Sequence, residues 1–302
     1  MQKTSIATLA IMLTAAIWGS TFFVIKDAVA TVDPVDLLAA RFAVGALLPA
    51  LLFLPRLLRL NWRQWRVGLG LGVIYGLGQI TQTIGLTSTS ASVSGFITGT
   101  HVVITPLIMW AGFRIRPGRA LLLALGLAVA GLAALSLTGG PGGFGLGETL
   151  TLAGAAIYAV HIVLLDRHAE AADPVSLAIV QLLGVALTCA LAGLPGGYAI
   201  PLGEASVWGA VLYTGIVAGV VTMGLQSWAQ RHLSPTRTAL LMTLEPVFAA
   251  GFALALGGEH LTWRLALGGC LIVLATVVGV GPVRPAAAAG GRGSSRGSQR
   301  HR

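Results

Sequence analysis

The sequence predicts an all-α integral membrane protein, in which ten transmembrane helices form two inverted five-helix repeats around a central cavity. Composition, an internal repeat and the distribution of positive charge support this fold class. Of the 302 residues, 55% are hydrophobic and only 10% are charged, and the mean hydropathy is +0.85. Soluble domains carry roughly 25% charged residues, so a chain this poor in charge belongs in a bilayer.

A repeat with an offset of 140 residues divides the chain into two halves. Residues 15–47 and 155–187 align without a gap, and nine of the 33 positions are identical, including the triplets Ala-Ala-Ile and Asp-Pro-Val. We therefore expect a first five-helix repeat over residues 1–140, a second over 141–281, and a disordered basic cytoplasmic tail over 282–302. The tail either binds anionic lipid headgroups or is simply solvated.

Ten segments are long and apolar enough to cross a bilayer, which takes about 20 residues of helix. They are 6–26, 34–54, 66–86, 90–112, 118–138, 146–165, 174–194, 206–229, 235–256 and 262–281. Several of them begin close to a proline, which favours the first turn of a helix. The first segment is not a cleavable signal peptide, because it is too long, has a polar midsection and lacks a small-residue cleavage site before Lys26.

Positive charge predicts the orientation of the bundle. With a cytoplasmic amino terminus, the inner segments hold 16 of the 19 Lys and Arg residues, the outer segments hold Lys26 and Arg264, and Arg41 lies within the second span. Positive residues concentrate in cytoplasmic loops, so we expect a multi-pass inner-membrane protein with both termini in the cytoplasm. Ten spans give five per half, so the second repeat is inverted, as in many secondary transporters.

The net charge of +9 does not indicate a nucleic-acid partner, because the positive residues lie in short loops and the tail. They form no basic stripe interleaved with aromatic residues. Cys189 and Cys270 stand alone in apolar runs, so neither a disulfide framework nor a metal site is predicted. The expected partners are the lipid bilayer and a small-molecule substrate, and no cofactor is expected.

Polar residues recur on single faces of several predicted spans. A charged or strongly polar side chain at bilayer depth costs about 2.5–3.5 kcal/mol, so such faces are expected to line a cavity. In the third span, three polar residues stand at i, i+4 and i+7 of one helical face. In the first and sixth spans, an aromatic residue and a hydrogen-bonding residue three positions later occur at matching places in the repeat. The predicted substrate-binding residues are Trp18, Thr21, Tyr75, Gln79, Gln82, His101, Tyr158, His161, Tyr213 and Gln226.

Three of these residues have a second interpretation. Trp18 either lines the cavity or is a large packing residue. His101 and His161 either contact the substrate or form hydrogen bonds between helices.

Glu245, Arg41, Pro106 and Pro246 are candidates for coupling or gating. Glu245 lies about 15 Å along the ninth span at 1.5 Å per residue, where loss of water favours a neutral carboxyl group. It is either a proton carrier, with a histidine as its partner, or a structural residue beside the helix break at Pro246. Pro106 occupies the matching place in the first half, so the pair suggests two gated halves. Arg41 either extends outward to Asp36 or attracts an anionic group.

The fifth and tenth spans carry almost no polar side chains. They hold small residues four apart, as in Gly126/Ala130 and Ala275/Gly279. Such spacing lets helices approach closely, so we expect these spans to be peripheral and to serve packing or self-association.

The chain resembles the EamA family of the drug/metabolite transporter superfamily. The resemblance rests on Ala-Ile-Trp-Gly-Ser-Thr-Phe at 16–22, Asp33-Pro34 with Arg41-Phe42, Leu-Glu-Pro-Val at 244–247 and Leu-Gly-Gly-Glu at 256–259, and it covers residues 5–281. It implies ten helices in two inverted repeats, a central cavity and, often, export of amino acids or other small metabolites. One departure is that Glu259 has no acidic counterpart in the first half, which puts paired acids in doubt.

These observations favour a secondary transporter of small amphiphilic metabolites, with an amino acid exporter, for aromatic amino acids among others, as the leading hypothesis. A multidrug exporter of lipophilic cations and a sugar or nucleotide-sugar carrier are the alternatives. An enzyme is not predicted, because the chain shows neither clustered acids nor a metal-binding constellation.

Overall fold

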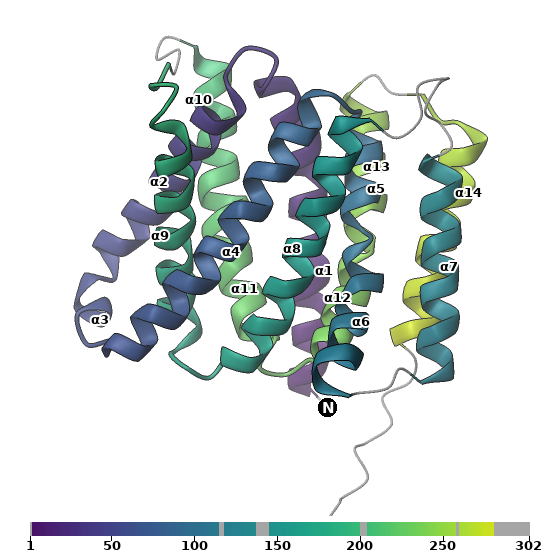
Figure 1. Cartoon of the computed structure of the whole chain (residues 1–302), viewed down its shortest axis with the longest axis horizontal. Coiled ribbons are helices and arrows are strands. Elements are labelled where there is room, and N and C mark those ends of the chain that lie inside the picture. Colours follow the sequence, from purple (N-terminus) through teal and green to yellow (C-terminus); the bar gives the residue numbers. More distant parts are fainter. Residues whose placement is uncertain (1, 115–117, 137–144, 200–203, 258–259, 281–302) are drawn as a thin grey trace, which may run out of the picture.

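The computed structural model describes residues 2–114, 118–136, 145–199, 204–257 and 260–280 (Figure 1). Within these ranges the chain is helical and contains no strand. The predicted tail and Glu259 lie outside the described residues.

The spanning segments of the first half run up and down through the bundle, and α5 and α6 together form one of them. They are α1 (Gln2–Ala28), α2 (Pro34–Leu52), α3 (Leu54–Leu57), α4 (Trp62–Thr87), α5 (Ala91–Thr98), α6 (His101–Phe113) and α7 (Arg119–Ser136). The second half follows with α8 (Leu146–His168), α9 (Pro174–Gly193), α10 (Ala205–Leu212), the π-helix η1 (Tyr213–Val221), α11 (Thr222–Ala229), α12 (Pro235–Met242), α13 (Leu244–Leu256) and α14 (Trp263–Val280).

Eight helical segments of the described chain are long and apolar enough to cross a membrane. Three of them are interrupted, at Ala91–Phe113, Ala205–Ala229 and Pro235–Leu256, where the sequence predicted single spans. Shorter apolar helical stretches, Arg119–Gly131 and Trp263–Ala275, lie within the segments predicted as the fifth and tenth spans. The multi-pass helical architecture is therefore as expected, whereas the interruptions inside three spans are new information.

Local sequence explains where the helices begin. Asp33 and Asp173 cap α2 and α9 with their side chains, and each is followed by a proline in the first turn. Asn61 and Gln64 form a reciprocal capping box at the start of α4. Such caps satisfy backbone N–H groups that have no partner within the helix.

Replacing Asp173 with alanine is expected to destabilise the protein by about 1 kcal/mol, because its carboxylate accepts a hydrogen bond from the backbone N–H of Ser176 at 3.1 Å. Burial raises the pKa of Asp173, but hydrogen bonds from Ser176 and the charge of Arg56 outweigh it and lower the pKa below its ordinary value. A depressed pKa means that the contribution is lost as pH falls through the folded-state value. Thermal unfolding should therefore show a difference at pH 7 that shrinks below about pH 4.

Asp173→Asn is the matched control, since asparagine caps equally well without a charge. It should match the wild type at pH 7 and, because asparagine does not titrate, keep the contribution of the cap below about pH 4, where the wild type loses it. An Asn variant as unstable as the Ala variant would contradict the capping role.

Two interrupted spans break at equivalent places near the middle of the bundle. The break between α5 and α6 lies at Gly99 and Thr100, and the break between α12 and α13 lies at Thr243. Pro246 lies just after the second break, where it removes the N–H that would bond to Met242 O. Pro106 lies six residues after Thr100, inside α6. The first break is therefore not at the proline.

Helices of the first half pack directly against helices of the second half throughout the bundle. Helix α4 packs against α8 and α9, α1 packs against α11 and α13, and α2 packs against α9 and η1. Glycines permit the closest crossings. A Cβ at Gly72 of α4 would collide with Gln181 O and would come within 2.8 Å of Gly184 Cα, both in α9. Contacts between residues far apart in sequence thus surround the centre of the bundle.

Helices α7 and α14 form a separate pair at one edge (Figure 1). Of the two roles predicted for Gly126 and Ala130, packing between these helices is not seen, because both residues are exposed, and self-association stays a prediction. Ala124, Ala128 and Gly131 make the contact instead, and a Cβ at Gly131 would come within 2.9 Å of Gly268 O. Spacing alone does not determine which face of a helix meets its neighbour.

Candidate functional site

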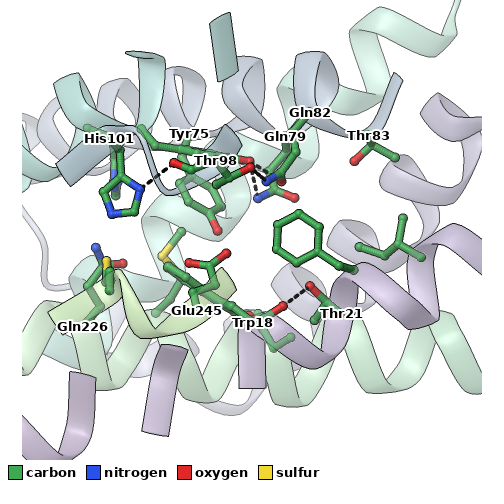
Figure 2. Close-up of a pocket in the computed structure, with 18 of the residues that line it drawn as sticks. Trp18, Thr21, Tyr75, Gln79, Gln82, Thr83, Thr98, His101, Gln226 and Glu245 are labelled. Carbon is green, nitrogen blue, oxygen red and sulfur yellow. Dashed lines mark hydrogen bonds between the residues drawn. The ribbon is translucent and has the colours of Figure 1, made fainter. Parts of the chain in front are cut away.

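A cavity lies at the centre of the bundle, between helices of both halves. Figure 2 shows Gln79, Gln82 and His101 on one wall, Trp18 on the facing wall, and the Glu245 carboxylate pointing into the space between them. The cavity volume is about 50 Å³, and one water needs about 10–15 Å³ on this scale. This conformation therefore has room for a few waters, and a larger solute requires the helices to move.

Nine of the ten predicted substrate-binding residues line this one cavity. They are Trp18, Thr21, Tyr75, Gln79, Gln82, His101, Tyr158, His161 and Gln226. Tyr213 does not line it, because its hydroxyl contacts Ser20 Oγ instead. Among the gating candidates, Arg41 and Glu245 line the cavity, whereas Pro106 and Pro246 do not. The role of these residues in binding a substrate stays a prediction.

A continuous hydrogen-bond chain crosses the cavity wall. Arg41 Nη2 donates to Gln79 Oε1, and Gln79 Nε2 donates to the Tyr158 hydroxyl at 2.8 Å. Tyr158 in turn donates to Gln82 Oε1 at 2.9 Å, and Gln82 Nε2 donates to Thr98 Oγ1 at 2.8 Å. The chain joins α2, α4 and α5 of the first half to α8 of the second. The two amides are thus held in one orientation, with spare hydrogen-bonding capacity for a solute.

Trp18 combines the two interpretations that the sequence left open. Its Nε1 donates to Ala218 O at 2.9 Å and to Thr222 Oγ1 at 2.8 Å, which ties α1 to η1 and α11. Its ring lies 6.1 Å from the Tyr75 ring, between centroids, and also lines the cavity. The indole N–H is therefore structural, while the ring faces the cavity.

The two histidines bond to protein groups rather than to Glu245. His161 Nε2 lies 2.9 Å from Gln181 Oε1, and His101 Nδ1 lies 2.8 Å from Thr98 O. The centroids of the His161 and Tyr75 rings are 5.1 Å apart. In this conformation neither histidine is the partner of the carboxylate, so the interhelical alternative describes His161.

An arginine and a glutamate face the cavity without forming an ion pair with each other. Arg41 and Glu245 are each only 5% exposed. Arg41 donates to Gln79 and not to Asp36, whose carboxylate accepts from the backbone N–H of Ala199 at 2.8 Å. The alternative in which Arg41 extends outward to Asp36 is therefore not seen, and the attraction of an anionic group stays a prediction.

Sequence reasoning missed the apolar part of the lining. The missed residues include Phe22, Ile25, Phe42, Leu86, Met223 and Met242. An apolar side chain in a spanning helix gives no sign of whether it faces lipid, protein or a cavity. Polar residues do give such a sign, because lipid exposure is costly for them.

Long apolar helices around a central cavity with both apolar and polar walls are typical of a multi-pass membrane protein of the transporter class. The sequence model of the EamA-like transporter family matches this chain twice, over residues 5–137 and 145–280. The chain therefore belongs to the EamA-like transporter family, and the resemblance seen in its motifs is confirmed.

A relative agrees with this assignment, and a solved structure has the same fold. A protein of Archaeoglobus fulgidus, described as an uncharacterized transporter, is 31% identical over 272 residues, which cover 90% of this chain and 85% of the relative. A crystal structure with 23% sequence identity matches with a TM-score of 0.70 over 90% of this chain and 95% of that chain. At this identity, the structure shows that the fold is shared.

Proposed function

We propose that the protein is a secondary transporter that exports small amphiphilic metabolites, amino acids first among them, by alternating access. The observation that carries the proposal is the composition of the cavity wall. The rings of Trp18, Tyr75 and Tyr158 lie beside the oriented amides of Gln79 and Gln82. Apolar walls with a few fixed polar groups suit a small organic solute, and aromatic amino acids match the rings.

We also propose ten spans in two inverted repeats, 1–140 and 141–281. The double match of the family model supports this division. Packing of α4, from the first half, against α8 and α9, from the second, supports a cavity at the interface of the repeats. We also propose that the protein self-associates through the α7–α14 pair, because the small residues Gly126 and Ala130 of α7 are exposed.

The contacts between loops support the proposed orientation, with both termini cytoplasmic in an inner membrane. Arg231, after α11, donates to Ala169 O and Ala172 O, after α8. These arginine-bearing connections therefore meet at one end of the bundle, where the amino terminus also lies (Figure 1). Lys26 donates to Leu86 O and Thr89 O, both at 2.8 Å, at the far end of α1. Such a one-sided distribution matches the positive-inside rule.

Proteoliposomes test the proposal. Vesicles loaded with radiolabelled phenylalanine, tryptophan, leucine, glucose or the lipophilic cation tetraphenylphosphonium are diluted, and efflux is compared with protein-free vesicles. We expect the protein to speed the efflux of the three amino acids relative to protein-free vesicles, and to leave the efflux of glucose and tetraphenylphosphonium unchanged. Efflux of tetraphenylphosphonium or glucose without amino acid efflux would instead support the drug or sugar alternative.

Tyr158→Phe is expected to lower the rate of amino acid efflux about ten-fold. The change removes the hydroxyl that bonds to both Gln79 and Gln82. It leaves the buried amide of Gln79 and the half-buried amide of Gln82 short of a partner, which costs about 1–3 kcal/mol for a buried group. Initial efflux rates at equal protein density measure the effect.

Tyr198→Phe is the matched control, because that hydroxyl bonds to Ala190 O in an exposed position and Tyr198 does not line the cavity. It should transport like the wild type. Equal rates for Tyr158→Phe and the wild type would remove the hydrogen-bond chain from the substrate site.

We further propose that Glu245 carries the coupling proton. Among the described residues, no hydrogen bond or ion pair reaches its buried carboxylate. The charged and titratable groups that share the cavity with it are Arg41 of α2, Tyr75 of α4, Tyr158 and His161 of α8, and His101 of α6. A carboxyl group in this position can exchange its proton whenever the cavity opens to water.

A further inference from the structure

Arg41 is a buried cation whose hydrogen-bonding capacity is largely unused. Its side chain lines the cavity and the residue is 5% exposed. Nη2 donates to Gln79 Oε1, whereas Nε and Nη1 are buried and have no hydrogen-bond partner. Buried polar groups are nearly always hydrogen-bonded, so two such N–H-bearing nitrogens on one side chain require an explanation.

The groups around Arg41 do not supply its missing partner. Gln79 is neutral, and the Phe42 ring, whose centroid lies 4.5 Å from Arg41 Cζ, offers a cation–π contact but no full negative charge. Asp36 is engaged with Ala199 N. Glu245 faces the same cavity without forming an ion pair with Arg41. A charge removed from water without a partner is strongly unfavourable, so the partner is expected to come from a bound solute.

The backbone of Arg41 is held firmly enough to define a binding site. At the crossing of α2 with η1, a Cβ at Gly215 would collide with Arg41 O, and a Cβ at Gly45 would come within 2.5 Å of Gly215 O. This close packing fixes the base of the side chain, while Gln79 fixes its far end through Nη2. The remaining nitrogens are therefore placed in advance of binding, which reduces the entropy that binding must overcome.

We infer that the Arg41 guanidinium binds the carboxylate of the transported solute, through the nitrogens that Gln79 leaves free. Guanidinium groups recognise carboxylates well because of their fixed planar donors. The inference rests on the proposed function and sharpens it, since the substrate must carry a carboxylate as well as an apolar body.

Calorimetric titration of the purified full chain with three related compounds tests this inference. The compounds are L-phenylalanine, 3-phenylpropionate, which lacks the ammonium group, and 2-phenylethylamine, which lacks the carboxylate. Each is titrated into the wild type, Arg41→Gln, Arg41→Lys and Arg56→Gln, an exposed arginine in α3 whose loss changes the net charge equally. We expect Arg41→Gln to bind L-phenylalanine and 3-phenylpropionate about thirty-fold or more weakly than the wild type does. Its affinity for 2-phenylethylamine should be unchanged.

Arg41→Lys should bind the carboxylates with intermediate affinity, and Arg56→Gln should match the wild type. The inference is overturned if the wild type binds 2-phenylethylamine as tightly as phenylalanine, or if Arg41→Gln leaves the carboxylate affinities unchanged. The first of these results needs no variant, so it decides the question even if Arg41→Gln does not fold.

Thermal unfolding without ligand separates a binding role from a structural one. Removing an unpaired buried charge should raise the unfolding temperature of Arg41→Gln above that of the wild type. A structural role would lower it, and would overturn the inference.

Acetate distinguishes failure of the inference from failure of the proposed function. If none of the three aromatic compounds binds the wild type, the proposed amino acid substrates are wrong. In that case, stabilisation of the wild type by acetate that is absent in Arg41→Gln still supports a carboxylate site. If acetate stabilises the wild type and Arg41→Gln equally, the inferred carboxylate site at Arg41 is wrong.

Discussion

Glu245→Gln is expected to abolish proton-driven accumulation of substrate while leaving exchange of substrate across the bilayer intact. Glutamine keeps the size and polarity of the side chain but cannot carry a proton. Movement of one charge across 100 mV is worth about 2.3 kcal/mol, which corresponds to about fifty-fold accumulation. The variant should therefore bring substrate only to equal concentrations on both sides, because the gradient no longer has a carrier.

Two assays on the same vesicles separate coupling from transport. Uptake driven by an imposed pH gradient and membrane potential reports coupling, and exchange of labelled for unlabelled substrate without a gradient reports the conformational cycle. Glu170→Gln is the control, because Glu170 is an exposed carboxylate in the loop after α8. It should behave like the wild type in both assays.

Gradient-driven accumulation by Glu245→Gln at the wild-type level would show that the proton is carried elsewhere or not at all. Loss of both gradient-driven uptake and exchange would assign Glu245 a structural role at the break before Pro246. Among the described residues, the Glu245 carboxylate has no hydrogen-bond partner. This supports the proposed coupling role, because a structural glutamate would bond to the backbone groups freed at that break.

Most of the polar residues of the site were visible in the sequence, although Thr83 and Thr98, which also line the cavity, were not among the predicted substrate-binding residues. Gln79 and Gln82 stand on one face of α4, and the internal repeat related Trp18 to Tyr158, so these residues could be assigned to one cavity before any coordinates. The structure adds how they are connected. Tyr158 accepts from Gln79 and donates to Gln82, a contact between halves that no spacing within a single helix could reveal.

Other features depend on tertiary packing and left no clear pattern. The break at Gly99 and Thr100 lies away from the proline that was expected to cause it. The π-helix η1 widens the backbone where α2 crosses it, beside Gly45 and Gly215. His161 bonds to Gln181, so a residue that appeared free to bind substrate is partly occupied. Each depends on a neighbour from a distant part of the chain.

Gly72→Ala is expected to destabilise the protein although it improves the helix propensity of α4. Alanine is favoured over glycine in a helix by about 1 kcal/mol. At Gly72, however, the new methyl group would collide with Gln181 O and come within 2.8 Å of Gly184 Cα, which are backbone atoms of α9 and cannot rotate away. Forced separation of packed elements costs about 1–3 kcal/mol or more, so the clash outweighs the gain.

Gly70→Ala is the matched control on the same helix, because a Cβ at Gly70 would meet nothing within 4 Å. We expect the Gly70 variant to unfold at or above the wild-type temperature, and the Gly72 variant to unfold several degrees lower. Equal stability of the two variants would mean that α4 and α9 can separate freely. The crossing also positions Tyr75 and Gln79, one and two turns further along α4. Transport by the Gly72 variant should therefore fall even at temperatures where it remains folded, since the hydrogen-bond chain to Tyr158 tolerates little displacement.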